Sequence, residues 1–225
     1  MGMNWKAVLD SIPILNQAAL LTLELTAGAV GIGLIIGLFM ALARLSKTKI
    51  MRAIAIAYID FFRGTPLLVQ IFLVYFLIPK ILHWDTLPDN YQYTAGVMAM
   101  SLNSGAYIAE IFRAGIQSID RGQSEAARSL GMSHSQAMFY VILPQAVKRV
   151  IPPLGNEFIA LLKDSSLLSI IAIQELFYTG KIIVGRTFQP VPMFLTVALY
   201  YLLMTQLISQ WVAYMERRLG KNDLR

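Results

Sequence analysis

The chain has 225 residues, of which 56% are hydrophobic and 14% charged, and its mean hydropathy is +0.59. Charged residues reach about 25% in soluble domains, so this composition excludes an ordinary soluble domain and indicates a membrane protein. The length suits about five membrane helices of roughly 20 residues each, in one domain covering residues 1–225. There is no cysteine, which excludes disulfides and thiol catalysis. The two histidines, His83 and His134, lack metal-ligand spacing, and we expect no metal site.

The N-terminal part predicts an amphipathic lead-in followed by the first membrane span. Residues 5–15 form the lead-in, and Trp5 suits a membrane interface. Because no compact apolar core precedes a small-residue cleavage site, we do not expect a removed signal peptide. The first span covers residues 18–43. In it, Gly33 and Gly37 are four residues apart, which favours close helix packing over a dimer seam, although either is open.

The second and third spans, residues 53–78 and 93–112, carry polar side chains that an apolar medium disfavours. Asp60 and Arg63 are three residues apart near the start of the second span, and we expect them to pair on one helix side. Gln70 and Asn103 each lie near the middle of their spans. Their amides could bind a substrate or hydrogen-bond between helices. Glu110 and Arg113 close the third span.

A polar segment at residues 115–149 separates the third and fourth spans. Ser124, as N-cap, and Glu125, in the first turn, predict the start of a helix. Gly131 interrupts it, as glycine does where the backbone turns, and a second helical run leads to Pro144. We therefore expect a short helix–turn–helix outside the lipid.

The fourth span begins near residue 150 and contains the most informative polar residues. Glu157 and Asp164 are seven residues apart and share a helix face. The run from Lys163 to Ser166 suits lipid poorly, which predicts an unwound or kinked helix lining a cavity. For Lys163 and Asp164, a mutual structural lock is an equal alternative. A loop with Lys181 and Arg186 and a fifth span at residues 193–214 follow.

Positive charges give the expected orientation. If residues 115–149 face the cytoplasm, thirteen Lys and Arg residues lie in inside segments, against four outside, Lys6, Lys80, Lys181 and Arg186. Cytoplasmic loops are enriched in such charges, so we expect the N-terminus outside and the C-terminus inside. The net charge of +6 is then a topology signal and does not require nucleic acid.

The polar segment carries a resemblance to a known family. Glu125-Ala126-Ala127, Gly131 and Leu143-Pro144 stand at the spacing of the EAA loop, which marks membrane subunits of bacterial ABC importers that work with a binding protein. Where the loop usually has Ile, this chain has Val141. Further motifs resemble the polar amino-acid branch of these permeases, and they cover most of the chain from the second span to the fourth: residues 63–70, 106–113, 122–123, 144–146, 156–159 and 162–167.

The resemblance implies an all-α permease of the type I ABC importer class, with a cytoplasmic EAA coupling helix, in the bacterial inner membrane. It implies two ATP-binding-cassette subunits, a second permease copy or paralogue, and an extracytoplasmic amino-acid-binding protein. The residues that contact the ATPase would be Glu125, Ala126, Ala127 and Gly131. Gly180-Lys181 lacks the upstream glycine of a phosphate loop, so we expect no cofactor in this chain and ATP with Mg²⁺ on the ATPase.

The chemistry of the spans suggests the substrate. A buried acid suits a cationic group, so we expect Glu157, Asp164, Asn103 and Gln70 to bind a polar amino acid, with a lean towards arginine, lysine or histidine. Two rival functions fit the sequence less well. An ion-coupled secondary transporter usually has more helices or an inverted repeat. A membrane enzyme needs a catalytic set, for which the sequence gives no signal.

Overall fold

The computed structural model describes residues 5–84, 86 and 88–220, and this part is helical, without strands. The prediction of an all-α protein is confirmed. The helices are α1 (Lys6–Leu45), α2 (Lys49–Gly64), α3 (Leu67–Ile81), α4 (Tyr91–Gln117), α5 (Arg121–Ser129), α6 (His134–Ala137), α7 (Leu143–Asp164), α8 (Leu176–Thr187) and α9 (Pro190–Gly220), with a π-helical turn at Met138–Ile142 and a 3-10 segment at Ser165–Ile171.

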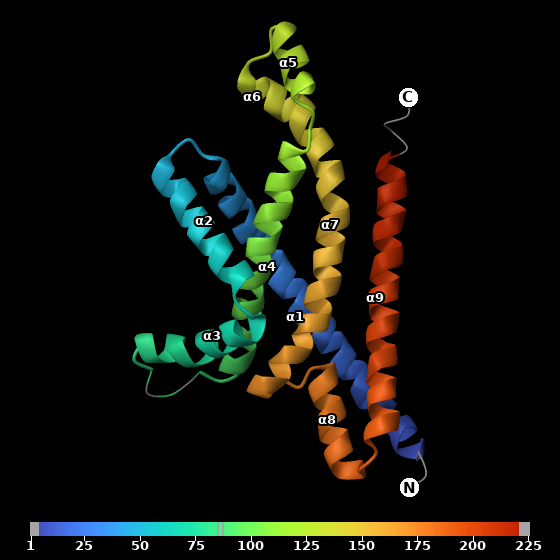
Figure 1. The fold of residues 1–225 in the computed structure, drawn as a ribbon. Coiled ribbons are helices and arrows are strands. Elements are labelled where there is room, and N and C mark those ends of the chain that lie inside the picture. Colours follow the sequence, from blue (N-terminus) through green and yellow to red (C-terminus); the bar gives the residue numbers. More distant parts are fainter. Residues whose placement is uncertain (1–4, 85, 87, 221–225) are drawn as a thin grey trace.

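The long helices form an open bundle from which one polar segment projects (Figure 1). Helices α4, α7 and α9 run roughly along one direction, and α1 packs obliquely across them. Helices α5 and α6 extend beyond the others at one end. The opposite end holds α8 and the start of α1. The expected lead-in at residues 5–15 is therefore not a separate element, because α1 runs unbroken from Lys6 to Leu45.

Helices α1 and α9 are each long and apolar enough to cross a membrane, and two bent helix pairs could add two more crossings. The pairs are α2 with α3, and the stretch His134–Ile171 with α8. Helix α4 has 27 residues, or about 40 Å, which is long enough to span a bilayer, but its composition is less apolar than that of α1 and α9. The count of five crossings stays a prediction.

The predicted second span is wrong as a single helix. It breaks between Gly64 and Leu67, and the two halves, α2 and α3, meet at 111°. Pro66 explains the break, because a proline disfavours helical backbone in the residue before it, and Thr65 is extended, with φ −120° and ψ 148°. The expected loop with Lys181 and Arg186 is also wrong, since both residues lie in α8.

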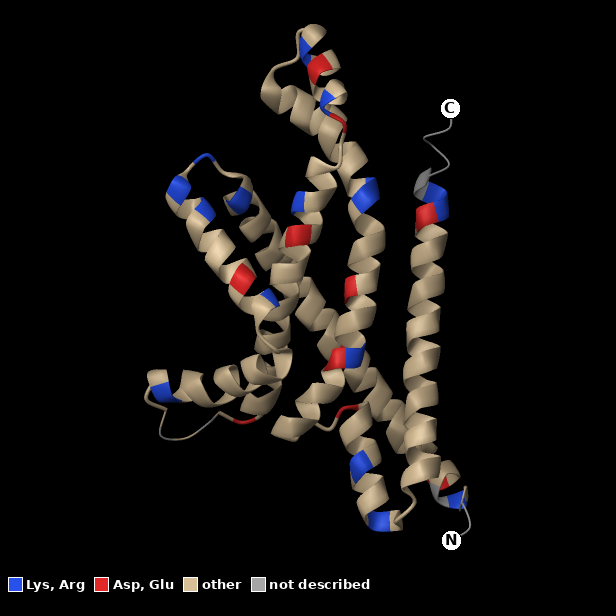
Figure 2. Ribbon diagram, in the orientation of Figure 1, with Lys and Arg blue, Asp and Glu red and all other residues tan. Residues whose placement is uncertain are grey.

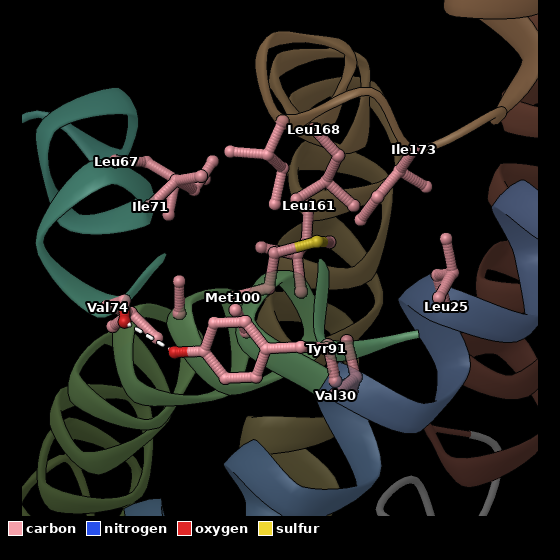
Figure 3. Packing of buried hydrophobic residues seen from close by; sticks show 14 of the residues in the cluster. Leu25, Val30, Leu67, Ile71, Val74, Tyr91, Met100, Leu161, Leu168 and Ile173 are labelled. Atoms are coloured by element: carbon pink, nitrogen blue, oxygen red, sulfur yellow. Dashed lines mark hydrogen bonds between the residues drawn. The ribbon is translucent and has the colours of Figure 1, made fainter. Parts of the chain in front are cut away.

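Apolar side chains from α1, α3, α4, α7 and the segment after α7 form the main core (Figure 3). Met100 and Leu161 are fully buried in it, and the Tyr91 hydroxyl donates a hydrogen bond to the Val74 carbonyl at 2.9 Å. The two small residues of the first span serve this packing. A Cβ at Gly37 would lie 2.6 Å from Ile108 Cγ2, and one at Gly33 would lie 3.3 Å from Gly105 N. They therefore permit close contact between α1 and α4 within the chain.

Candidate functional site

The projecting segment is a compact helix–turn–helix. Helix α5 begins at Arg121, and Asp120 is its N-cap, accepting a hydrogen bond from Gly122 N at 2.7 Å. The prediction of Ser124 as the cap is wrong, because the helix starts four residues earlier, with Asp120 as its cap. At the other end Gly131 has φ +86°, Gly131 N donates to Arg128 O and Met132 N donates to Ala127 O. This is a Schellman ending, which favours glycine because of its left-handed backbone.

The second half of the segment leads directly into a membrane helix. Ser133 and Gln136 form a capping box at the start of α6. A π-helical turn then joins α6 to α7, where Leu143 begins the longer helix. Below the turn, Ile119, Ile142 and Ala146 form a small buried cluster that fixes the segment on the ends of α4 and α7.

The three residues of the Glu-Ala-Ala motif do not share one environment. Glu125 and Ala126 are exposed, and the Glu125 carboxylate makes no hydrogen bond or ion pair with any residue that the structure describes. Ala127 is 4% exposed and packs inward. Glu125, Ala126 and Gly131 are thus available on the surface, whereas Ala127 supports the loop from within.

Large apolar side chains are also exposed on this projecting segment, and sequence reasoning did not single them out. Leu130 is 82% exposed, and Phe139 and Tyr140 are also exposed, with their rings edge to face at 5.4 Å. Exposed apolar groups on a polar projection are typical of a protein interface. The signal for Leu130 was present in the sequence, since it stands beside Gly131, whereas Phe139 and Tyr140 lie in the π-helical turn that the sequence did not reveal.

Helix α7 carries the two acids of the predicted substrate site. Glu157 is half-buried beside the Ser104 hydroxyl of α4, and that hydroxyl makes no hydrogen bond of standard geometry among the described residues. Asp164 is exposed at the end of α7, two turns further along, and close enough to interact electrostatically with Glu157. The spacing of seven residues places the two acids on one face of α7.

Helix α7 ends within the polar run Lys163–Ser166, where the sequence predicted an unwound or kinked helix. Helix α7 ends at Asp164 and continues as a 3-10 segment, Ser165–Ile171. Lys163 and Asp164 form no ion pair among the described residues, so the structural-lock alternative gains no support. Instead, Lys163 lines a cavity of about 450 Å³ between the end of α7, α8 and α9, together with Phe177 and Tyr201.

Gln70 and Asn103 lie together but bind the backbone at the break between α2 and α3. Gln70 Nε2 donates to the carbonyls of Phe62 and Thr65 at 2.8 and 3.0 Å, and Asn103 Nδ2 donates to Gln70 Oε1 at 2.9 Å. Gln70 is 1% exposed and Asn103 7%. These contacts match the alternative of hydrogen bonding between helices, because they occupy the donors that a substrate would need.

One buried acid was missed by sequence reasoning. Glu175 is fully buried as the N-cap of α8, where its carboxylate accepts hydrogen bonds from Phe177 N and Tyr178 N at 2.8 and 2.7 Å. The Tyr201 hydroxyl of α9 donates to the same carboxylate at 2.9 Å. Glu175 thus ties α8 to α9. Its place just before a new apolar run was the available signal.

The expected pair of Asp60 and Arg63 does not form. Asp60 is exposed, and Arg63 points to Glu110 of α4 at 3.7 Å. Glu110 also pairs with Arg44 of α1 at 2.5 Å and with Arg113 at 2.8 Å. One carboxylate therefore joins α1, α2 and α4, and helical spacing did not reveal it because two of the three partners are distant in sequence.

Comparison with known proteins identifies the family. Residues 33–221 match the family described as "binding-protein-dependent transport system inner membrane component". The chain is 38% identical over 219 residues to the glutamine transport system permease protein GlnP of Escherichia coli K12, covering 97% of this chain and 99% of that protein. It is 34% identical to the arginine transport system permease protein ArtQ of Bacillus subtilis, covering 99% of this chain and 100% of that protein.

A solved structure agrees with these relatives. The crystal structure of an amino acid ABC transporter with histidines contains a chain that is 43% identical, with a TM-score of 0.90, covering 97% of this chain and 100% of the other. The rival secondary transporter and membrane enzyme readings receive no such support. This chain is an amino-acid ABC importer permease, and it belongs to the family of binding-protein-dependent transport system inner membrane components.

Proposed function

We propose that this permease forms half of a translocation pathway for a polar amino acid, with a basic one favoured. The observation that carries this proposal is the pair of acids on α7: Glu157 is half-buried at mid-helix, and Asp164 stands where the helix changes to a 3-10 segment. Carboxylates in that position attract an ammonium or guanidinium and repel acidic substrates. The relatives' named substrates, glutamine and arginine, are consistent with a polar amino acid and leave the basic preference to experiment.

The exposed part of α5 and its turn would dock on the ATPase. Glu125 and Ala126 are exposed, and Leu130, Phe139 and Tyr140 add exposed apolar surface on the same projecting segment. ATP and Mg²⁺ would be bound by two copies of a separate ATPase, and this chain would hold no cofactor. ATP-driven closure of the ATPases would then rock the membrane helices and open the pathway alternately to each side.

One permease chain would form only half of the translocation pathway, so further subunits are needed. A second permease, identical or paralogous, would supply the other half, and an extracytoplasmic binding protein would deliver the amino acid. The chain would be oriented with its N-terminus outside and its C-terminus inside. The distribution of basic residues supports this, because they gather at the end of the bundle that bears α5 and the end of α9 (Figure 2).

The decisive experiment is reconstitution of this chain with its ATPase in proteoliposomes, measuring ATP hydrolysis and uptake over a panel of amino acids. Stimulation by arginine, lysine or histidine supports the proposal. Gly131→Val should abolish stimulation, because φ +86° is strained for a β-branched residue, whereas the matched Gly131→Asn should retain much of it, because Asn tolerates that backbone. If the ATPase does not co-purify with the intact chain, the coupling role is wrong.

A further inference from the structure

A second cavity, distinct from the acids of α7, lies between α4 and α7 near the end that bears α5. Its volume is about 580 Å³. Three arginines line it, namely Arg63 from the end of α2, Arg113 from α4 and Arg149 from α7, and Glu110 is the one acidic side chain among the described lining residues. The remaining wall is mostly apolar or small. The cavity therefore has a strongly basic lining.

The single carboxylate is already satisfied by other groups. Glu110 accepts a hydrogen bond from Arg113 Nε at 3.1 Å and pairs with Arg113 Nη2 at 2.8 Å, while Arg44 binds it from the α1 side, outside the cavity. Arg63 stands further away at 3.7 Å, with its guanidinium over the Tyr107 ring at 5.3 Å. Its side chain is 43% exposed, so it keeps donors that face open space.

Arg149 adds a further cation on the opposite wall. It is exposed, and its guanidinium donates to the Ser118 carbonyl, which bonds only part of a group with five N–H donors. Arg44, Arg63 and Arg113 thus share the one carboxylate, and Arg149 lies on the same cavity without an acidic partner among the described residues. Such an excess of positive charge beside an apolar wall is costly without an anion, and guanidinium groups suit the paired oxygens of phosphate or carboxylate.

The position of the cavity indicates which kind of anion is available to bind in it. It lies along the last turns of α4 and the first turns of α7, at the end of the bundle where the other basic residues gather (Figure 2). In the orientation proposed above, Ser118 and Arg149 of its lining lie towards the cytoplasmic headgroups, where anionic lipids create a negative surface potential. Basic pockets between membrane helices on this side suit lipid phosphates.

We propose that this cavity binds an anionic phosphate group, and that the group is the headgroup of an anionic phospholipid in the cytoplasmic leaflet. Arg63 and Arg149 hold the phosphate from opposite walls. Arg113 contributes charge while it remains bound to Glu110. The inference rests on the proposed orientation of the chain and does not depend on which amino acid is transported.

The test uses the permease purified with its ATPase, in nanodiscs of phosphatidylcholine with increasing fractions of phosphatidylglycerol. Phosphatidylglycerol retained by the complex is quantified by mass spectrometry. Removing one guanidinium, in Arg63→Gln or Arg149→Gln, should weaken retention on the order of fivefold, the equivalent of one basic residue near a charged membrane. Arg63→Lys should lose less, because it keeps the charge. The matched control is Arg52→Gln, an exposed arginine of α2 outside the cavity, which should change retention little.

A second arm separates lipid from soluble phosphate. Inorganic phosphate is added to the complex in pure phosphatidylcholine nanodiscs, and the melting temperature is recorded. Phosphate could raise the melting temperature only when Arg63 and Arg149 are present, while the complex shows no preference for phosphatidylglycerol. That result would support the anion site but contradict the lipid as its occupant. Equal retention by the wild type and both cavity variants, or an equal loss in Arg52→Gln, would overturn the site. Neither readout measures transport, so a negative result in this experiment would not count against the proposed role in amino-acid uptake.

Discussion

Gln70 and Asn103 are 33 positions apart in the chain, and their side chains meet at 2.9 Å across the break between α2 and α3. Together they bind the carbonyl oxygens of Phe62 and Thr65, which the break removes from regular helix bonding. An unsatisfied polar group is especially costly where no water can replace the partner. The pair therefore stabilises the angle between the two helices.

The first prediction concerns this pair. Gln70→Leu should lower the free energy of unfolding by about 2 kcal/mol, because it leaves buried acceptors without donors. Unfolding in mixed detergent, followed by circular dichroism, measures the change. Gln210→Leu is the control, since Gln210 is exposed on α9. If Gln70→Leu instead alters substrate selectivity at unchanged stability, Gln70 binds substrate directly.

The second prediction concerns the charge cluster on α4. Glu110→Gln should destabilise the protein by about 2 kcal/mol, less than the ~3–5 kcal/mol of a fully buried pair, because three guanidinium groups lose their counter-charge and the site is partly hydrated. The Glu110 side chain is 14% exposed. Asp60→Asn, on exposed α2 surface, should have little effect. A loss in Asp60→Asn equal to that in Glu110→Gln would show that Arg63 depends on Asp60 after all.

The third prediction separates two neighbouring alanines of the projecting segment. Ala127→Leu should destabilise by about 1–3 kcal/mol, because a larger side chain must enter a packed position. Ala126→Leu should leave stability within about 0.5 kcal/mol, as exposed substitutions do, and should reduce ATPase stimulation by blocking close approach. Thermal unfolding and ATP hydrolysis are measured on both variants. Full stimulation in Ala126→Leu would remove Ala126 from the docking surface.

The fourth prediction concerns the acid at the middle of α7. Glu157→Gln should reduce uptake of arginine or lysine about tenfold, the effect of losing one charged hydrogen bond, and should reduce glutamine uptake less. Initial rates in proteoliposomes measure both. Glu24→Gln is the control, because Glu24 is exposed on α1. Equal losses for charged and neutral substrates would assign Glu157 to the α-ammonium group common to all amino acids.

Local patterns in the sequence predicted part of this molecule. Gly131 marked the turn, and the run after Lys163 marked the end of α7, because backbone strain and polarity are encoded within a few residues. Pro66 was overlooked as a break, since the apolar residues on either side read as one span. Hydropathy measures the affinity of a segment for lipid and does not report the direction of its helix axis. The sequence therefore could not predict the 111° angle between α2 and α3.

Pairings between distant segments were the least predictable feature. Glu110 offered a partner three residues away, Arg113, but its contacts with Arg44 and Arg63 depend on how α1 and α2 pack against α4. Glu175 was missed for a similar reason. Its capping role is local, whereas its bond to Tyr201 exists only because α9 returns alongside α8. Spacing along one helix cannot reveal such contacts.

Helix α7 can be considered as a lever. Its 22 residues, about 33 Å, separate the π-helical turn below the projecting segment from Asp164 at the other end. A tilt of about 10° would carry one end roughly 6 Å relative to the other, a distance comparable to an amino-acid side chain. Pro152 and Pro153 lie inside this lever and remove helix hydrogen bonds there. The stiffness of α7 at these two prolines therefore determines how far a movement of the projecting segment displaces Asp164.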